Sequence, residues 1–236
     1  MKKKLAAFLL LASVLCALPS YAENYVGTFP VVRVLLTNSY QADHGANHLA
    51  IAQADMHYVK QPFIAVYNKH MSFSYAYVAP IPMDSCPISN IMTCCNDSCG
   101  TCANTISGGH HKNMYKNFFK IKNDISSSGY DHILTLASGN FCNIHSHPST
   151  PHYAYGLGDF DGKYALCKQN SAITQIVRVR TVQHELSHNY GCSDHSPGDT
   201  TACIMNGSYD SAPLTTVDIW CSNCKDDFIA PIYPSR

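Results

Sequence analysis

The sequence predicts an α+β domain in which helices cover a mixed β-sheet, and three patterns lead to this class. Residues 30–37 form an apolar, β-branched run that is typical of a buried strand. Residues 46–60 carry apolar side chains at three- and four-residue steps, which is the period of an amphipathic helix. Residues 173–190 repeat that period in the strongest helical pattern of the chain. Strands and helices that follow one another in this way favour a mixed sheet with helices packed on it.

Shorter patterns predict the other strands. Residues 71–78 alternate between large apolar side chains and serines, so we expect a strand with one buried face. Residues 130–136 form another short strand candidate. Residues 153–158 and 163–167 flank a turn, and we expect them to pair as a hairpin or as neighbouring strands.

Single residues and local composition predict where elements begin and end. Pro62 should end or kink the first helix, Ser171 is a candidate N-cap of the second, and Gly191 is a candidate stop. A short helix is expected near residues 217–220. Residues 84–113 are rich in turn residues and cysteine, which predicts an excursion held by disulfides.

Composition excludes several classes of protein. Lys+Arg and Asp+Glu both number 16, so a nucleic-acid binder with a basic surface is not expected. Hydrophobic residues make up 46% of the chain, which is enough for a core and argues against disorder. The 12 cysteines are many for a cytosolic protein and indicate an oxidising compartment.

Residues 1–22 have the features of a secretory signal peptide. Three lysines precede an apolar run over residues 5–18, which is shorter than the roughly 20 residues that a membrane-spanning helix needs. Ser20-Tyr21-Ala22 then provides a small-x-small cleavage site. We therefore expect residues 23–236 to be exported as one catalytic domain without a membrane span, either secreted or, in a bacterium, periplasmic. Cleavage would remove one of the 12 cysteines, so one free thiol or an intermolecular disulfide is expected.

The second helix contains the pattern HExxH, formed by His184, Glu185 and His188. Histidines four residues apart lie on one helical face, so both imidazoles can bind one metal ion. Zinc favours such nitrogen ligands, and Glu185 is placed to act as a general base on a metal-bound water. The chain has one other glutamate, Glu23, so a chance match at the position of Glu185 is not expected.

The residues after this motif supply a third ligand. Gly191 can adopt the left-handed conformation that turns the chain back at a helix end. Asp194 follows three residues later, and His195 is next to it. The arrangement HExxHxxGxx plus a ligand resembles the metzincin zinc metalloproteases, whose third ligand is usually His and occasionally Asp. Spacing favours Asp194 and ligand type favours His195, so both remain candidates.

A second motif strengthens the resemblance. Cys203-Ile204-Met205 resembles the reprolysin (adamalysin) branch of the metzincins, and Met205 matches the methionine that packs in a turn beneath the zinc ligands. The resemblance implies a twisted mixed sheet with two main helices above the zinc in residues 23–191, and a small irregular lower subdomain in residues 192–236. It also implies that residues 153–158 form an edge strand that binds extended peptide.

The cysteines near this motif are expected to form disulfides. Cys192 and Cys203 would close the zinc loop, and Cys221 or Cys224 would close the tail.

Together these features predict a secreted zinc-dependent endopeptidase that hydrolyses proteins or peptides with a zinc-bound water and Glu185 as general base. Two alternatives stay open. One is a zinc-containing secreted binding protein in which the metal serves only the fold. The other is the protease subunit of a larger, toxin-like assembly, to which a spare cysteine could tether it.

Overall fold

The chain is organised around a five-stranded sheet with the strand order β2-β1-β3-β7-β6. A computed structural model describes residues 30–77, 113–139, 142–143, 152–153, 155–196, 201–206 and 212–228. Four strands are parallel to one another: β1 (Val31–Leu36), β2 (Ser72–Tyr77), β3 (His132–Ala137) and β7 (Tyr164–Lys168). The short strand β6 (Gly156–Gly158) pairs antiparallel with β7 at one edge, so the sheet is mixed. A separate two-stranded ladder joins β4 (Cys142–Asn143) to β5 (His152–Tyr153).

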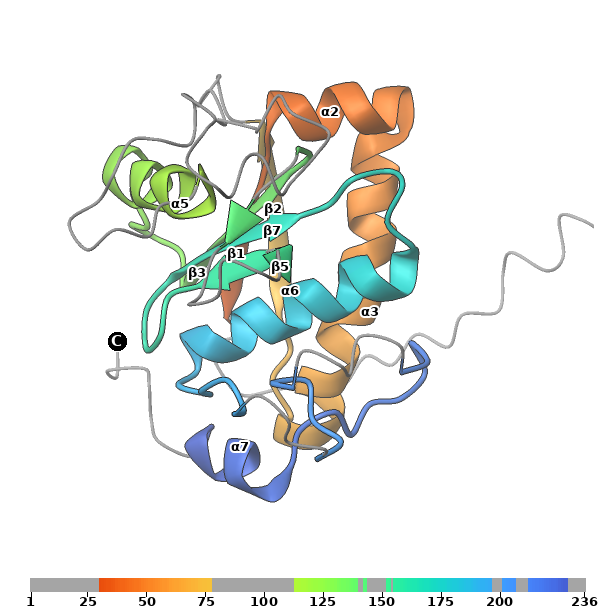
Figure 1. Cartoon of the computed structure of the whole chain (residues 1–236), viewed down its shortest axis with the longest axis vertical. Helices are drawn as coiled ribbons and strands as arrows, with labels where there is room; N and C mark the ends of the chain where they lie inside the picture. The colour runs from red at the N-terminus through yellow and green to blue at the C-terminus, as the bar shows by residue number, and fades with distance from the viewer. Residues whose placement is uncertain are drawn as a thin grey trace, which may run out of the picture.

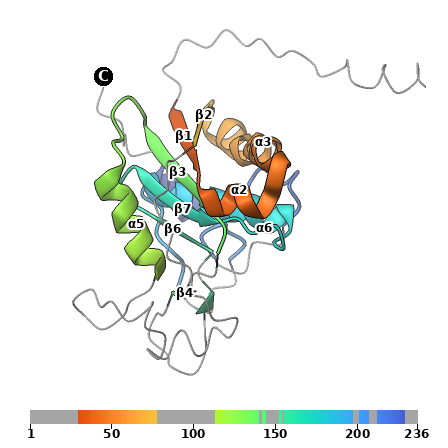
Figure 2. The ribbon, with the colours of Figure 1, turned by 90° about the horizontal axis from the view of Figure 1, so that it is seen from above.

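Helices lie on both faces of this sheet (Figures 1 and 2). They are α2 (Asn38–His44), α3 (His48–Tyr67), α5 (Asn113–Asp124), α6 (Gln175–Asn189) and α7 (Ser222–Asp227), with a 3-10 turn over Gly45–Asn47. The helices α3 and α6 pack against each other on one side, and α5 lies on the other side. The helix α7 lies below α6, away from the sheet (Figure 1).

The two faces of the sheet bury two separate apolar cores. Val34 of β1 belongs to the larger core, which it shares with α3 and α6. Its neighbour Leu35 belongs to the smaller core under α5, with Phe118 and Ile121. Successive side chains of a strand point to opposite faces, so β1 is buried on both sides as predicted from its continuous apolar run.

The predicted strands are confirmed with small changes at their ends. Residues 30–37 and 71–78 contain β1 and β2, and β3 extends one residue beyond the predicted range 130–136. Residues 153–158 contain β6, and β7 extends one residue beyond the predicted range 163–167; the two pair as neighbouring antiparallel strands.

The sequence predicted that Pro62 ends or kinks the first helix. It does not end the helix, because α3 continues to Tyr67. Proline has no N–H group, so the carbonyl four residues earlier, that of Tyr58, loses its helical donor. The buried side chain of Gln183 on α6 supplies one instead, with its Nε2 atom 3.2 Å from the Tyr58 oxygen. Gln183, which is 121 positions after Pro62 in the chain, therefore allows α3 to continue beyond the proline.

The ends of α6 are partly as expected. Thr174, not Ser171, is the N-cap, and its hydroxyl accepts a hydrogen bond from the N–H of Val177. Ser171 is instead bound through its own N–H and hydroxyl to the carboxylate of Asp43. Gly191 lies just beyond the helix with a φ of 90°, the left-handed conformation expected for a stop.

The helix predicted near residues 217–220 is absent, and α7 begins at Ser222. The reason lies in the backbone of Ile219, whose carbonyl accepts a hydrogen bond of 2.6 Å from the N–H of Ile204. This pairing holds the segment extended beside the turn at Met205. The helices α2 and α5 were not predicted at all.

Other predictions fall largely outside the described residues. The signal peptide (residues 1–22) does so entirely, and the cysteine-rich stretch 84–113 does so except for its last residue. The division into subdomains at residues 191 and 192 stays a prediction. Within the described part of the chain, no helix combines the length and apolar character needed to span a membrane.

Candidate metal centres

The helix α6 carries the HExxH residues on the side that faces strands β6 and β7. His184 and His188 are one turn apart, and their ring centroids are separated by 4.9 Å. After the turn at Gly191 the chain folds back, so that Oδ1 of Asp194 lies 3.1 Å from Nε2 of His184 and 3.5 Å from Nε2 of His188. Ligands at about 2.0 Å from a tetrahedral zinc would be roughly 3.3 Å apart, so the two distances to Asp194 suit one metal ion.

Backbone carbonyls hold both imidazole rings in the orientation that ligation needs. Nδ1 of His184 lies 2.8 Å from the oxygen of Ile204, and Nδ1 of His188 lies 2.7 Å from the oxygen of Cys192. Because a carbonyl oxygen can only accept, each Nδ1 carries a proton, which leaves Nε2 as the atom that binds a metal when the ring is neutral. Metal-binding histidines in proteins are held in this way by their second nitrogen.

The charges around these rings favour a cation between them. Burial lowers the pKa of His184, but the hydrogen bond to Asp194 and the charges of Glu185 and Asp194 outweigh it and raise that pKa to about 9. For His188, burial and the neighbouring charge of His184 lower the pKa. The carboxylates of Asp194 and Glu185 thus favour positive charge at His184.

Glu185 is buried between α6 and the edge strand β6. Burial raises the pKa of its carboxyl group to about 7, while the charge of His184 and a hydrogen bond from the N–H of Gly158 act in the opposite direction. A carboxyl group with a pKa near neutrality can both accept and return a proton at neutral pH. One of its carboxylate oxygens lies within 4.8 Å of a ring nitrogen of each histidine.

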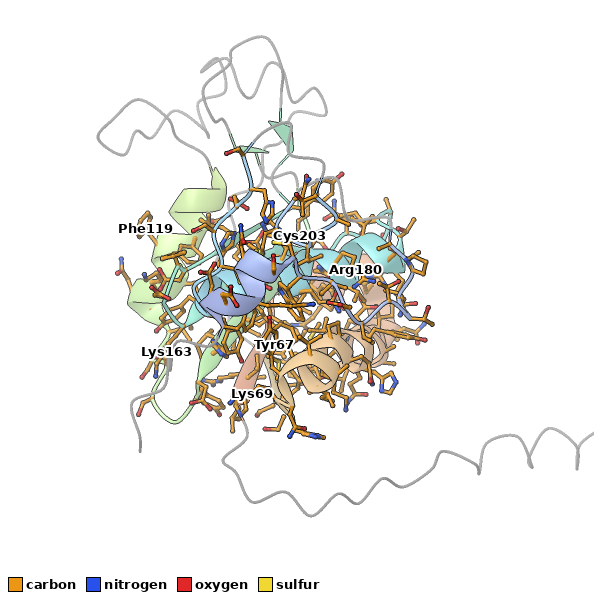
Figure 3. All side chains as sticks on the ribbon, turned by 90° about the horizontal axis from the view of Figure 1, so that it is seen from below. Tyr67, Lys69, Phe119, Lys163, Arg180 and Cys203 are labelled. Carbon is orange, nitrogen blue, oxygen red and sulfur yellow. The ribbon has the colours of Figure 1, made fainter. Side chains whose placement is uncertain are left out.

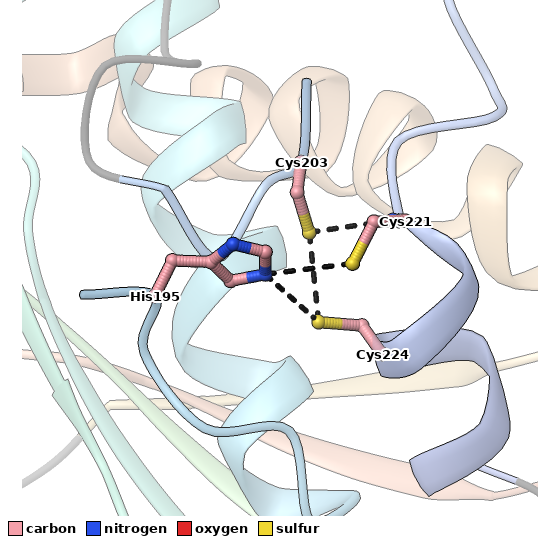
Figure 4. Close-up of side chains that lie close together, drawn as sticks. All are labelled: His195, Cys203, Cys221 and Cys224. Atoms are coloured by element: carbon pink, nitrogen blue, oxygen red, sulfur yellow. Dashed lines mark hydrogen bonds between the residues drawn. The ribbon is translucent and has the colours of Figure 1, made fainter. Parts of the chain in front are cut away.

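His195, the other candidate for the third ligand, faces away from the two histidines of the HExxH motif. Its Nε2 atom lies 3.4 Å from Sγ of Cys224 and 3.5 Å from Sγ of Cys221 (Figure 4). The Sγ atom of Cys203 completes the group at 3.5 Å from that of Cys224. Sulfur ligands at about 2.3 Å from a tetrahedral zinc would be roughly 3.8 Å apart, so these four side chains could hold a second metal ion.

The predicted disulfide between Cys192 and Cys203 is wrong. All five cysteines whose side chains the structure describes are free: Cys167, Cys192, Cys203, Cys221 and Cys224. The thiol of Cys192 contacts the carbonyl oxygen of Cys224 at 3.5 Å, and Cys203 belongs to the group around His195. The shortest sulfur–sulfur separation recorded among them, 3.5 Å, is far from the roughly 2.05 Å of a disulfide bond.

The sequence carries a signal for this second group, although the disulfide interpretation passed over it. Cys221 and Cys224 form a C-x-x-C pair, a spacing typical of zinc ligands. The pair brackets the first turn of α7, where its two thiols can reach one ion. The turn at Met205 places Cys203 and His195 beside this pair of cysteines.

The turn at Met205 connects both groups of side chains. Met205 is buried, and the N–H of Asn206 closes the turn on the oxygen of Cys203 at 2.9 Å. The carbonyl of Met205 accepts a hydrogen bond of 3.0 Å from the N–H of His195. Since the neighbouring Ile204 carbonyl holds His184, one turn orients a residue from each group.

A buried arginine attaches the segment after this turn to α6. Arg180, which Figure 3 labels, donates from its guanidinium group to the backbone oxygens of Ala212, Pro213 and Thr216. Below it, Tyr67 at the end of α3 stacks on Phe228 with ring centroids 4.3 Å apart. The described residues 212–228 are therefore packed against α6, which carries the HExxH residues, and against the end of α3.

Comparisons with known proteins bear on the fold. No protein-family model and no curated protein matches the chain. Among solved structures, the chain is similar to archaemetzincin from Methanopyrus kandleri, with a TM-score of 0.51 and 15% sequence identity over 88% of this chain and 97% of the other. At this identity the likeness is one of fold, and it extends to a metzincin but gives no support to the reprolysin branch in particular. The chain thus has a metzincin-like α/β fold, with a five-stranded mixed sheet and a HExxH helix packed beneath it.

Proposed function

We propose that the protein is a zinc-dependent endopeptidase with His184, His188 and Asp194 as its metal ligands. The observation that carries this proposal is the convergence of two imidazole Nε2 atoms and one carboxylate oxygen beside the buried Glu185. The fold likeness to an archaemetzincin agrees with it. The substrate would be a protein or peptide.

Zinc bound to these ligands would supply a Lewis acid for the scissile carbonyl and would lower the pKa of a water molecule towards about 7. The residues of the chain provide the rest. Glu185, buried beside the two histidines, accepts the proton of the attacking water and returns it to the leaving amine. The carbonyls of Ile204 and Cys192 keep both imidazoles in the ligating tautomer throughout.

A second zinc ion would be held by His195, Cys203, Cys221 and Cys224. Four protein ligands leave no position for water or substrate, which is the property of a structural zinc site. This assignment leaves Asp194 as the third ligand of the first ion. It would also give the thiol of Cys203 a role as a metal ligand in place of the disulfide expected from the sequence.

Export from the cytoplasm remains part of the proposal, and its support is the signal-like segment of residues 1–22. The N-terminal residue of the mature protein, read by mass spectrometry from a native source, tests it. Cleavage after Ala22 is the expected result, and an intact N-terminal segment on the folded protein would contradict it.

The deciding experiment compares Glu185→Gln with the wild type on a peptide library. The variant keeps the volume and hydrogen bonding of the side chain but cannot accept a proton, so the rate of cleavage should fall by about 10²–10⁴. Its zinc content, measured by mass spectrometry under native conditions, should not change. Asp226→Asn, an exposed acid on α7, is the matched control and should cleave like the wild type.

Two results would overturn the proposal. One is full cleavage by zinc-loaded Glu185→Gln, which would remove the general base. The other is a wild-type protein that holds zinc but cleaves no peptide. That second result would favour a binding protein with structural zinc, for which the closed group around His195 is the supporting observation.

A further inference from the structure

The strand β6 approaches α6 so closely that two of its three residues could not carry a side chain unless a neighbouring group moved. A Cβ atom on Gly156 would overlap Oε1, Cγ and Cδ of Glu185. A Cβ atom on Gly158 would overlap the backbone oxygen of Glu185 and lie 2.8 Å from Cβ of His188. Between them, Leu157 packs on the opposite face of the sheet, in the core under α5. The alternation of a strand thus turns both glycines towards the HExxH residues.

The two glycines differ in what they make room for. At Gly158 the obstacle is the backbone of α6, so an added methyl group would have to push the helix away from the sheet. At Gly156 the obstacle is the end of one flexible side chain. An added methyl group there could be accommodated by rotating Glu185 out of its place, with the backbone left as it is.

The residues around Gly156 explain why the carboxyl group of Glu185 occupies the space that the missing side chain leaves. Gly156 and Gly158 are paired with Cys167 and Ala165 of β7, two small residues, so the edge of the sheet offers a shallow surface to the helix. The N–H of Gly158 donates a hydrogen bond to the Glu185 carboxylate. The carboxyl group is therefore bounded by Gly156 on one side and tied to Gly158 on the other.

We propose that Gly156 is a positioning residue whose missing side chain leaves the space in which the Glu185 carboxyl group stands ready for catalysis. This inference rests on the proposed function of Glu185 as general base. It assigns to β6 a role apart from pairing with β7: the strand sets where the base is located relative to the His184 and His188 nitrogens.

The test is the variant Gly156→Ala, studied in the wild type and in a Glu185→Ala background. When Gly156→Ala is the only substitution in the zinc-loaded protein, we expect kcat to fall about 100-fold, which is the effect of misplacing a reacting group by about 1 Å. KM and zinc content should stay unchanged. The thermal midpoint should fall, because Glu185 must leave its place. In the Glu185→Ala background the same substitution should leave the midpoint unchanged, because the shortened side chain no longer has the overlapping atoms.

Gly158→Ala is the matched comparison, since its obstacle is backbone that every side chain at position 185 shares. It should lower the thermal midpoint by the same amount in both backgrounds. Should Gly156→Ala alone fail to fold, the double variant with Glu185→Ala is still expected to fold, and that rescue would support the inference.

Three results would overturn it. They are wild-type kcat in Gly156→Ala, loss of its bound zinc, or an equal loss of stability in both backgrounds. Failure of the proposed function looks different, because Glu185→Gln would then cleave at the wild-type rate whatever Gly156→Ala does. The coupling of stability between residues 156 and 185 needs no activity and can be measured in either case.

Discussion

The contact between Gln183 and the Pro62 turn of α3 gives the structure's sharpest prediction about stability. Gln183 is buried, and its Nε2 atom donates to the oxygens of Tyr58 and Val59 at 3.2 and 3.3 Å. Its Oε1 atom accepts a hydrogen bond of 2.7 Å from Nη1 of Arg180. Gln183→Leu keeps the size of the side chain and removes all of these bonds.

The magnitude follows from the groups that lose a partner. The carbonyl of Tyr58 faces a proline in place of its usual helical donor, so the substitution leaves this partly buried group without its hydrogen bond from Gln183. One guanidinium nitrogen of Arg180 loses its side-chain acceptor. Each such loss costs about 1–3 kcal/mol, and more for a charged group, so we expect Gln183→Leu to lower the free energy of unfolding by about 4 kcal/mol. In a domain of this size that is a fall of roughly 10 °C in Tm.

Urea unfolding of the zinc-loaded protein, followed by circular dichroism, measures this loss. Gln61→Leu is the matched control, because Gln61 also donates to a helix carbonyl of α3, that of His57, but at an exposed site. It should change stability by less than about 0.5 kcal/mol. Equal effects of the two substitutions would refute the reasoning.

A second substitution tests the role of the proline directly. Pro62→Ala returns an N–H group to the helix opposite the Tyr58 carbonyl. It should therefore stabilise the Gln183→Leu variant more than it stabilises the wild type, in which Gln183 already supplies a donor. No difference between the two backgrounds would show that Gln183 does not compensate for Pro62.

Three further predictions concern buried charge, pH and metal content. Asp55→Ala leaves the guanidinium of Arg178, now 2.7 Å from the carboxylate, without its buried partner and should cost about 3–5 kcal/mol in urea unfolding, with Arg178→Leu recovering part of the loss. Burial lowers the pKa of His132 to about 4, so between pH 6.5 and 4 the unfolded chain binds a proton that the folded chain does not. Stability should therefore fall by about 2 kcal/mol from pH 7 to 5, and His132→Phe should reduce this fall. Native mass spectrometry should show that Asp194→Ala and His195→Ala each lose a different one of the two zinc ions. Asp194→Ala should still fold with the cysteine-bound ion, and His195→Ala should lack that ion. Loss of the same ion from both variants would contradict the division of ligands.

Local patterns were sufficient for the strands and for the HExxH helix. The apolar run of β1 and the period of residues 173–190 depend on burial along a single element, which the sequence displays directly. The end of α3 could not be predicted in this way, because the donor that compensates for Pro62 comes from Gln183 on another helix. The helix α5 was missed because it starts at the end of the stretch 84–113, whose turn residues and cysteines dominated the interpretation.

The candidate site shows the same limit. The spacing of His184 and His188 predicts that they share a face of one helix, and the structure brings them together. The choice between Asp194 and His195 could not be made from spacing or ligand type, because both reasons pointed to adjacent residues. The folded chain separates them by presenting each to a different group of side chains.

For Cys192, Cys203, Cys221 and Cys224, cysteine content led to a wrong prediction of disulfides for a physical reason. A count of thiols does not distinguish cysteines that bind one another from cysteines that bind a metal, and both uses bring sulfur atoms close together. Spacing is more informative, since Cys221 and Cys224 are placed for one ion by the first turn of α7. Among the cysteines that the structure describes, none requires an oxidising compartment, so the case for export depends on residues 1–22 and on the cysteines outside the described part of the chain.

The adjacency of Asp194 and His195 has a mechanical consequence for the two proposed zinc ions. Rotation of the backbone at this point would move the ligand of one ion whenever it moved the ligand of the other. The turn at Met205 adds a second connection, because its carbonyl holds the N–H of His195 while the carbonyl of Ile204 holds the ring of His184. An ion bound by the three cysteines and His195 would thus stiffen the segment that delivers Asp194 to the HExxH histidines. The closed group of ligands is, for this reason, the support on which the geometry of the open one depends.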